Sequence, residues 1–594
     1  MPKADLTELA ARLEEQLGDP HDPDSSMPFE QILAHDEREE FPYAFVNLLQ
    51  RWGVHEYVIP AAQGGKAGDV EVGFNLLRLI ARRDPTSATA LMLTSLSFMP
   101  AWIAGTEEQK QYVVDRMKQG TKLAWGLSER HHGSDVLANE MRAEKVEGGY
   151  LLTGEKWLIG NATVADGVSV FARTDPKGGP AGYSIFLVEK RNTPAGSVVE
   201  LPNERLHGLR ALDMSGVRLD GVFVPDSARL GHEGQGLEIA LKSAQVARTT
   251  IGSMALAAVD TALRVTLDFT EQREIFGKKV SDIPYSRRQL TEVFADLLIA
   301  DAVSLGAVRS LQLVPEQTSV WSSVAKYFVP TLLERSMAQL NIVLGARLYL
   351  RAHPHYGIYQ KMLRDLLVAI FADGNTVVNL KNIALQLDGL LATTKDPQAR
   401  SEAELRTPVL YGIDRKLPLY RPWDQELFSR GKDDALLGAP AALDRLRELA
   451  AEAKGEEQGW LERAAELAGE LLGRTDRLYA EATSLRAGLG REYGQSAELF
   501  DLAKQYTTLH ATAAVVHTFV HSHAALDDPL PSGALLLLQL ERLAREFEPH
   551  RVVTGAVEVD EVMRVLRRLH RGNRLFSYWQ FPLADRIGAD RAQS

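Results

Sequence analysis

The chain has 594 residues, more than one hydrophobic core normally holds, so three or four domains are expected. Its formal net charge of −12, from 67 basic and 79 acidic residues, argues against nucleic acid or an anionic membrane as the main partner. It contains no cysteine, which excludes disulfides, thiolate metal sites and a cysteine nucleophile.

Residues 1–120 are predicted to be helical, because apolar side chains such as Phe45, Leu49 and Trp52 recur at helical spacing. The N-terminus lacks a basic flank followed by an apolar run, so we expect no secretory signal. The most apolar short run, 534–538, is far too short to span a membrane. A cytoplasmic protein without a membrane span is therefore expected.

The hydrophobic pattern changes near residue 121. Short apolar segments separated by Gly, Pro and Asp predict strands at 150–152, 168–171, 183–188 and 222–224. Long helical patterns return from about 235 to 388, and again after 420. The predicted domains are therefore 1–120 (helical), 121–234 (β), 235–390 (helical) and 420–594 (helical), with a linker at 391–419.

The most informative segments are Trp125-Gly-Leu-Ser-Glu-Arg-His-His-Gly-Ser-Asp135 and Leu151-Leu-Thr-Gly-Glu-Lys-Trp-Leu-Ile-Gly-Asn161. In the first, an apolar strand runs into a turn that is rich in hydroxyl, carboxylate and glycine groups. In the second, a strand carries Trp157 and then Gly160. Hydroxyl and backbone N–H donors beside an aromatic plane suit a flavin, whose pyrimidine edge gains negative charge on reduction.

Two motifs resemble those of the acyl-CoA dehydrogenase superfamily: 128–135 is similar to its T-E-P-x-x-G-S-D, and 156–161 to its K-x-W-I-T-N. The resemblance continues over roughly residues 40–385 and includes 272–278 and 371–376. It implies a mainly α fold with a central β-barrel domain, preceded by a helical domain and followed by a four-helix bundle. The remaining residues look like the extra helical domain of acyl-CoA oxidases and very-long-chain acyl-CoA dehydrogenases.

The resemblance implies FAD as cofactor. Ser128 stands where the family has a flavin-contacting Thr or Ser, although an ordinary strand hydroxyl is the alternative. Gly160 replaces a Thr near flavin N5, so only a backbone N–H would serve there. Leu158 occupies the usual aromatic position and Trp157 lies one residue earlier, which on a regular strand turns its ring to the opposite face. Trp157 therefore either covers the flavin or packs in the core. The other cofactor residues implied are Gly133, Ser134, Ile159, Arg273, Phe276, Asn375 and Thr376.

Arg273 with Phe276-Gly277 resembles the R-x-x-F-G segment that reaches the flavin pyrophosphate of a neighbouring subunit. A guanidinium group suits phosphate oxygens, and an exposed salt bridge is the alternative. The resemblance therefore implies a homodimer or homotetramer.

In this superfamily a carboxylate removes the α proton of an acyl thioester while the β hydrogen leaves as hydride to flavin N5. The base is commonly a Glu nine residues after the Arg of an Arg-Asp pair; here Asp373 lies nine residues after Arg364 and is the candidate base. Such a base needs a pKa raised towards neutrality by burial. A rival alignment matches Asn375-Thr376 to the E-G-D-N-T of oxidase-like members and places Ala372 at the base position. Asp373-Gly374 would then be a turn only.

Four further residues match positions near the substrate: His131, His132, Arg248 and Gly374. A surface loop is the alternative for the two histidines, and structural pairing for Arg248. His517 and His521 have the i, i+4 spacing of zinc-binding helices, but the residues between them favour packing, so no metal is expected.

Three functional hypotheses follow. The first is an FAD-dependent acyl-thioester dehydrogenase that forms an α,β double bond, with acyl-CoA or an acyl carrier protein as substrate and an electron-transferring flavoprotein or O2 as acceptor. The second is an oxidase or monooxygenase on the same fold, favoured by the helical extension and by an aspartate base, which is similar to that of nitroalkane oxidase. The third is a non-catalytic flavoprotein scaffold, suggested by the departures at Leu158, Gly160 and Asp373.

Overall fold

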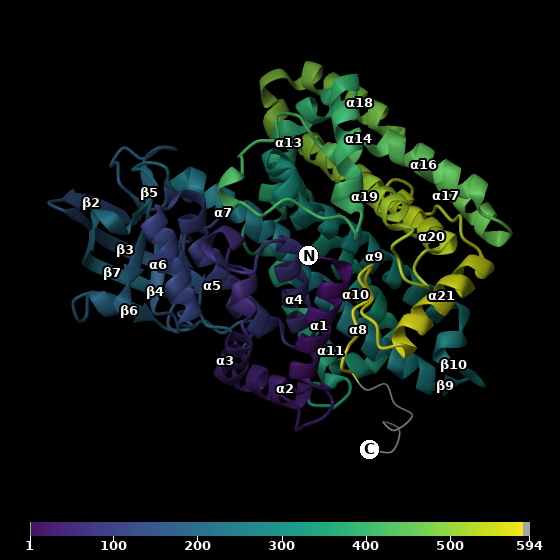
Figure 1. Cartoon of the computed structure of the whole chain (residues 1–594), viewed down its shortest axis with the longest axis horizontal. Coiled ribbons are helices and arrows are strands. Elements are labelled where there is room, and N and C mark those ends of the chain that lie inside the picture. The colour runs from purple at the N-terminus through teal and green to yellow at the C-terminus, as the bar shows by residue number, and fades with distance from the viewer. Residues whose placement is uncertain (1, 586–594) are drawn as a thin grey trace. The chain divides into compact units, whose positions relative to one another are not determined.

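The computed structural model describes residues 2–585, which form two compact units. The sheet unit consists of residues 34–247 and 419–427, and the helical unit consists of residues 2–33, 248–418 and 428–585. Figure 1 shows the elements of both units. The predicted fold class, mainly helical with a central β domain, is confirmed.

The sheet unit begins with helices and continues with one mixed sheet. Its helices are α3 (Tyr43–Trp52), α4 (Val70–Arg83), α5 (Pro85–Ala104) and α6 (Glu107–Lys118), while α2 (Phe29–Arg38) and α7 (Gly236–Thr250) cross its limits. Its strands are β1 (Leu123–Gly126), β2 (Arg142–Val146), β3 (Gly149–Gly160), β4 (Gly167–Arg173), β5 (Tyr183–Glu189), β6 (Val198–Leu201), β7 (Met214–Pro225) and β8 (Arg229–Leu230). The strand order is β6-β7-β3-β2-β4-β5-β8, and β1 and β2 run parallel to β4.

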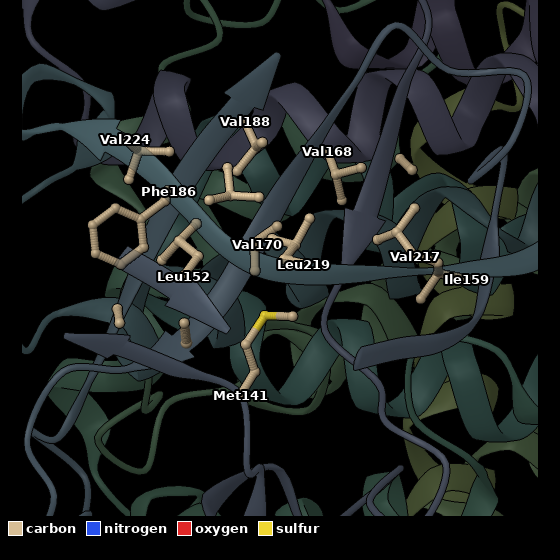
Figure 2. Close-up of a cluster of buried hydrophobic side chains, with 14 of the residues drawn as sticks. Met141, Leu152, Ile159, Val168, Val170, Phe186, Val188, Val217, Leu219 and Val224 are labelled. Carbon is tan, nitrogen blue, oxygen red and sulfur yellow. The ribbon is translucent and has the colours of Figure 1, made fainter. Parts of the chain in front are cut away.

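Alternate residues of these strands build one apolar core. Val168 and Val170 of β4 lie with Val217 and Leu219 of β7 in a cluster of fully buried side chains (Figure 2). Because side chains alternate between the two faces of a strand, this spacing of two is what places them together. The four predicted strand segments fall in β3, β4, β5 and β7 and are confirmed.

The helical unit contains the remaining long helices and one short hairpin. Its elements are α1 (Lys3–Leu17), α8 (Gly252–Gln272), β9 (Glu274–Ile275), β10 (Lys278–Lys279), α9 (Pro284–Leu313), α10 (Thr318–Leu344), α11 (Gly357–Asp365), α12 (Val368–Phe371), α13 (Thr376–Thr393), α14 (Pro397–Tyr411), α15 (Asp434–Leu437), α16 (Ala439–Glu452), α17 (Glu456–Leu472), α18 (Arg474–Leu489), α19 (Ala497–Ser522), α20 (Gly533–Ala544) and α21 (Ala556–Arg571).

Helices α8, α9 and α10 pack on one another and are buried on nearly all sides. Two segments of the described chain, Pro85–Ala104 and Gly236–Gln272, are long and apolar enough to cross a membrane by length and composition. Their most apolar windows are 83% and 94% buried inside the protein, as in core helices of globular domains.

Of the C-terminal helices α16–α21, α18, α19, α20 and α21 pack directly on the bundle formed by α8, α9, α10 and α13. Helix α19 contacts α9 and α13, and α16, α17, α18 and α20 surround it. The segment predicted to be a linker, 391–419, carries helix α14, which packs on α9 and α19. Helix α1 is grouped with the helical unit, and the domain limits drawn from the sequence remain a prediction.

Candidate active site

The turn that follows β1 is held by buried polar contacts. Glu129 accepts hydrogen bonds from the backbone N–H groups of Glu140 (2.6 Å) and Met141 (3.0 Å). Lys156 of β3 donates to Glu129 Oε1 (2.8 Å) and to the Leu127 carbonyl (3.1 Å). These bonds join both ends of segment 127–141, called the fixed turn below, to β3.

Glu129 and Lys156 form a buried ion pair. Burial alone raises the pKa of Glu129, but the charge of Lys156 and the two backbone N–H donors outweigh it and lower that pKa. Burial lowers the pKa of Lys156 to about 8, although Glu129 opposes the shift. This pair was missed in the sequence, although a Lys inside an apolar strand is a recognisable signal.

The residues predicted to contact the flavin edge lie on this fixed turn. Ser128 is half-buried, and Gly133 and Ser134 are exposed. Within residues 2–585, neither the Ser128 hydroxyl nor the Gly133 N–H has a hydrogen-bond partner. The turn therefore presents a hydroxyl and a backbone donor that fit the polar edge of a flat ligand.

The segment of β3 that carries Trp157 is not a regular strand. Trp157 pairs with Gly216 and Ile159 with Ser215, so Leu158 is an extra residue in a β-bulge, with φ +55°. Ile159 packs in the sheet core. A regular strand would place Trp157 and Ile159 on the same face; the bulge puts them on opposite faces, and the role of Trp157 at the flavin stays a prediction.

Trp157 is half-buried between two charged side chains. Its Nε1 donates to Glu204 Oε1 (2.9 Å), and the Arg130 guanidinium lies 4.6 Å from its ring centre. At Gly160, a Cβ would lie 2.2 Å from Leu93 Cδ1, so even an alanine requires Leu93 to move. The packing of α5 on β3 thus leaves no room for a side chain at position 160 unless Leu93 moves.

His131 and His132 line a cavity of ≈ 630 Å³ in the sheet unit, together with Arg130 and Arg142. His131 is exposed, while His132 Nδ1 lies 3.3 Å from Asp135. Both predicted substrate residues therefore sit at an open cavity beside the turn, and their role in binding stays a prediction.

Asp373 lies in the helical unit, in the turn between α12 and α13. Asp373 (φ +55°) and Gly374 (φ +99°) are both left-handed, and Asn375 then caps α13 through a bond from the Val378 N–H (3.0 Å). Arg248 Nε donates to the Asp373 carbonyl (2.9 Å), and its guanidinium packs on Gly374. The four predicted residues Arg248, Asp373, Gly374 and Asn375 are therefore in contact, and Thr376 begins α13.

The electrostatic surroundings of Asp373 suit a base. Burial raises the pKa of its carboxyl group, and the charges of Lys326 and Arg248 oppose that rise. Lys326 was missed in the sequence; it lies on α10, 47 positions before Asp373, and only helix packing brings the two together. The only lysine of α10, followed by the buried Phe328 and Val329, was the available signal.

Arg273 and Phe276 lie on the β9–β10 hairpin of the helical unit. Phe276 has φ +51° and is 95% exposed at the hairpin tip. Arg273 is exposed and makes no salt bridge within the described chain. No ion pair within the described residues competes with the predicted contact of Arg273 to a phosphate group, and that contact remains a prediction.

His517 is fully buried in α19, stacked on Tyr411 and His521, with Nε2 2.9 Å from the Ala435 carbonyl oxygen. Burial lowers the pKa of His517 to about 3 and that of His521 to about 4. Between residues 2 and 585, no group of three or more His, Asp and Glu side chains is arranged to hold a metal ion.

Three family models match the chain in order: acyl-CoA dehydrogenase N-terminal domain over residues 28–121, middle domain over 124–222 and C-terminal domain over 234–387. Together they span more than half of the chain. The predicted superfamily is thus confirmed, and the middle-domain match contains the fixed turn and the β3 bulge.

Among curated proteins, the chain is 33% identical to an acyl-CoA dehydrogenase of Bacillus subtilis over 248 residues, covering 41% of this chain and 65% of that protein. It is 26% identical over 345 residues to the caffeyl-CoA reductase-Etf complex subunit CarC of Acetobacterium woodii, covering 58% and 89%. The chain thus spans slightly less than two thirds of the Bacillus protein. The solved structure of butyryl-CoA dehydrogenase from Megasphaera elsdenii has the same fold, with TM-score 0.59, 23% identity and coverage of 65% and 97%.

Proposed function

Because the chain belongs to the acyl-CoA dehydrogenase family, whose members are FAD-dependent oxidoreductases acting on CH–CH groups, we propose that it forms an α,β double bond in an acyl thioester. The observation that carries the proposal is the setting of Asp373. Burial raises the pKa of this carboxyl group, Arg248 fixes its turn, and the exposed apolar side chains of Phe371 and Val377 flank it. A carboxylate held beside apolar surface suits the removal of a weakly acidic C–H proton.

In the proposed reaction, Asp373 Oδ takes the α proton, and the electrons of the broken Cα–H bond form the C=C bond. The β hydrogen leaves with its electron pair as hydride. When bound, FAD supplies the two-electron acceptor for that hydride. Asp373 ends the step protonated, and a raised pKa favours that state.

For the cofactor, we propose that the fixed turn of the sheet unit holds the polar edge of the FAD ring. The Ser128 hydroxyl and the Gly133 N–H are donors on this turn that have no partner in the described chain, and Ser134 follows Gly133 in the sequence. The bulged segment 157–160 would cover the ring, with the Gly160 backbone in place of a side-chain donor. Asn375 and Thr376, at the start of α13, remain proposed cofactor residues.

We also propose that the protein is a homodimer or homotetramer and that Arg273 and Phe276 of one subunit reach the FAD pyrophosphate of the next. The support is an exposed guanidinium and an almost fully exposed Phe on a short hairpin. Sedimentation analysis tests this: Arg273→Gln should leave the oligomer intact and weaken FAD retention, and unchanged retention contradicts it.

The proposed substrate is an acyl-CoA or an acyl carrier protein thioester, and the proposed acceptor is an electron-transferring flavoprotein, since the relative CarC is named as a subunit of an Etf complex. An oxidase that reduces O2 is the second candidate, and the long helical extension favours it. After anaerobic reduction, admitting air distinguishes the two: an oxidase reoxidises rapidly and forms peroxide, whereas a dehydrogenase needs the flavoprotein acceptor.

The test is the visible spectrum of the purified protein before and after anaerobic addition of a panel of acyl-CoA and acyl carrier protein thioesters. We expect a flavin band that bleaches with at least one of them, and we expect Asp373→Ala to retain the band and lose the bleaching. Asp476→Asn, an exposed carboxylate of α18, is the matched control and should bleach like the wild type. A colourless protein, or bleaching that persists in Asp373→Ala, contradicts the proposal.

A further inference from the structure

Lys326 is a buried, positively charged residue of helix α10. Its side chain is 1% exposed, and it lies in α10 between apolar neighbours. A buried ammonium group has a high desolvation cost unless a partner compensates it. Its hydrogen-bond acceptor is the carbonyl oxygen of Ala369, a buried residue of α12.

Two cations therefore hold the same short segment of backbone. Lys326 holds Ala369, four residues before the candidate base, and Arg248 holds the carbonyl of Asp373 itself at 2.9 Å. The guanidinium of Arg248 also packs on Gly374, where a Cβ would come within 3.0 Å of Nη2. The segment 369–374 is thus anchored from α10 at one end and from α7 at the other.

The three charges also act on one another. Burial lowers the pKa of Lys326 to about 7, with Asp373 raising it and Arg248 lowering it further. Burial raises the pKa of Asp373, and Lys326 is the larger of the two cationic influences that oppose this. Within the described residues, α8, α9, α13 and α19, which also pack on α10, contribute no other charge that acts on Lys326.

We propose that Lys326 is a positioning residue for the general base: its ammonium group holds the 369–374 turn through the Ala369 carbonyl and favours the ionised form of the Asp373 carboxylate on that turn. The role in turnover rests on the proposed function, whereas the coupling of the two groups does not. A nearby cation favours the ionised form of a carboxylate, which is the form that can take a proton. Lys326 supplies such a cation from α10, a helix that carries none of the proposed reacting groups.

The test is a 13C NMR titration of the carboxyl groups in the full-length protein labelled at aspartate Cγ, with the Asp373 signal assigned by its loss in Asp373→Asn. We expect Lys326→Met to move the Asp373 titration to higher pH, because a cation that favours the ionised form is removed. Lys326→Arg, which keeps the cation, should return it towards the wild type. Lys381→Met, which removes a lysine that also donates to a backbone carbonyl, should leave it unchanged.

An Asp373 titration that is the same in the wild type and in Lys326→Met overturns the inference, whether or not the protein turns over any thioester. If Lys326→Met changes the Asp373 titration but no thioester bleaches the flavin of the wild type, the result supports the coupling of Lys326 with Asp373 and contradicts the proposed function. In an active enzyme, the acid limb of the bleaching rate should move to higher pH in Lys326→Met. If the midpoint of that limb rises by about one pH unit, the fraction of Asp373 that is ionised at a pH well below the midpoint falls about tenfold. If Lys326→Met does not fold, Lys326→Gln provides the same comparison.

Discussion

At the scale of single residues, the backbone of one turn decides where the candidate base lies. Asp373 and Gly374 are consecutive left-handed residues, a conformation that Asp tolerates and Gly adopts freely. A side chain at Gly374 would be strained at φ +99° and would come within 3.0 Å of the Arg248 guanidinium. The position of the carboxyl group is therefore fixed by the turn, and the pKa of that group by its burial and the two cations.

Gly374→Ala is predicted to lower the free energy of unfolding by about 1–3 kcal/mol, since it combines an unfavourable φ with a close contact to Arg248. Urea unfolding measures this. Gly389→Ala, in α13, is the control: its Cβ would lie 3.6 Å from the nearest atom outside its own helix, so the variant should be neutral or up to about 1 kcal/mol more stable. Equal effects at the two positions would rule out this account of the turn.

The sequence predicted this site in part. The spacing from Arg364 made Asp373 the candidate base, and the motif order made the turn that carries Ser128 the candidate cofactor site; both roles stay predictions. Lys326 was missed because it lies on a different helix and nothing in a linear motif connects it to the base. The orientation of Trp157 could not be read from the sequence, because a bulge of one residue at Leu158 leaves no pattern of its own in a single sequence.

At the scale of elements, a buried ion pair joins the β1–β2 turn to strand β3. Lys156 is fully buried and Glu129 almost so, and the carboxylate also accepts two backbone N–H groups. Removing one charge of such a pair leaves the other unpaired in a poorly solvated place, which is more damaging than removing both. The pair therefore specifies the shape of the proposed cofactor turn as well as its stability.

Lys156→Met is predicted to cost about 3–5 kcal/mol of stability because it leaves Glu129 buried and unpaired. Combining it with Glu129→Gln should recover part of that loss. A double-mutant cycle from denaturant unfolding, with FAD retention followed in parallel, measures the coupling. If the double variant loses as much stability as the two single variants added together, the pair is not coupled and the interpretation is wrong.

The Glu129–Lys156 ion pair also predicts that the stability of the protein falls at acid pH. The folded-state pKa of Glu129 lies below its usual value of 4.5, so its contribution to stability is complete above that pH and is lost as the pH falls through the lowered pKa. The thermal unfolding temperature of the wild type should therefore fall more on acidification than that of Glu129→Gln. Parallel pH curves for the two proteins would show that Glu129 contributes nothing to the acid sensitivity.

At the scale of the whole molecule, the C-terminal helices and the bundle form one compact unit. Arg542 of α20 bonds to both carboxylate oxygens of Asp296 on α9 at 2.8 Å, and to Glu292 at 3.3 Å. Further on, the Phe576 N–H donates to Asp260, and Ser577 and the Tyr578 N–H donate to Asp301. Helical periodicity predicted these helices but not this packing, because Arg542 and Asp296 are 246 positions apart in the sequence.

Arg542→Met is predicted to lower stability by about 3–5 kcal/mol, since Asp296 is fully buried and would lose its cation. Differential scanning calorimetry should show the transition of the bundle moving together with that of the C-terminal helices. Arg447→Met removes an exposed pair with Asp444 and should change stability by no more than about 1 kcal/mol. Separate transitions, with the bundle unaffected, would mean that the extension is an independent domain.

The central claim is that Asp373 removes the α proton of an acyl thioester as the bound flavin is reduced. The most direct measurement is the rate of anaerobic flavin bleaching with an acyl-CoA and with its α-dideuterated form, in the wild type and in Asp373→Asn. The account predicts bleaching that α-deuteration slows in the wild type and that is at least about a hundredfold slower in Asp373→Asn. Bleaching at the wild-type rate in Asp373→Asn would contradict it.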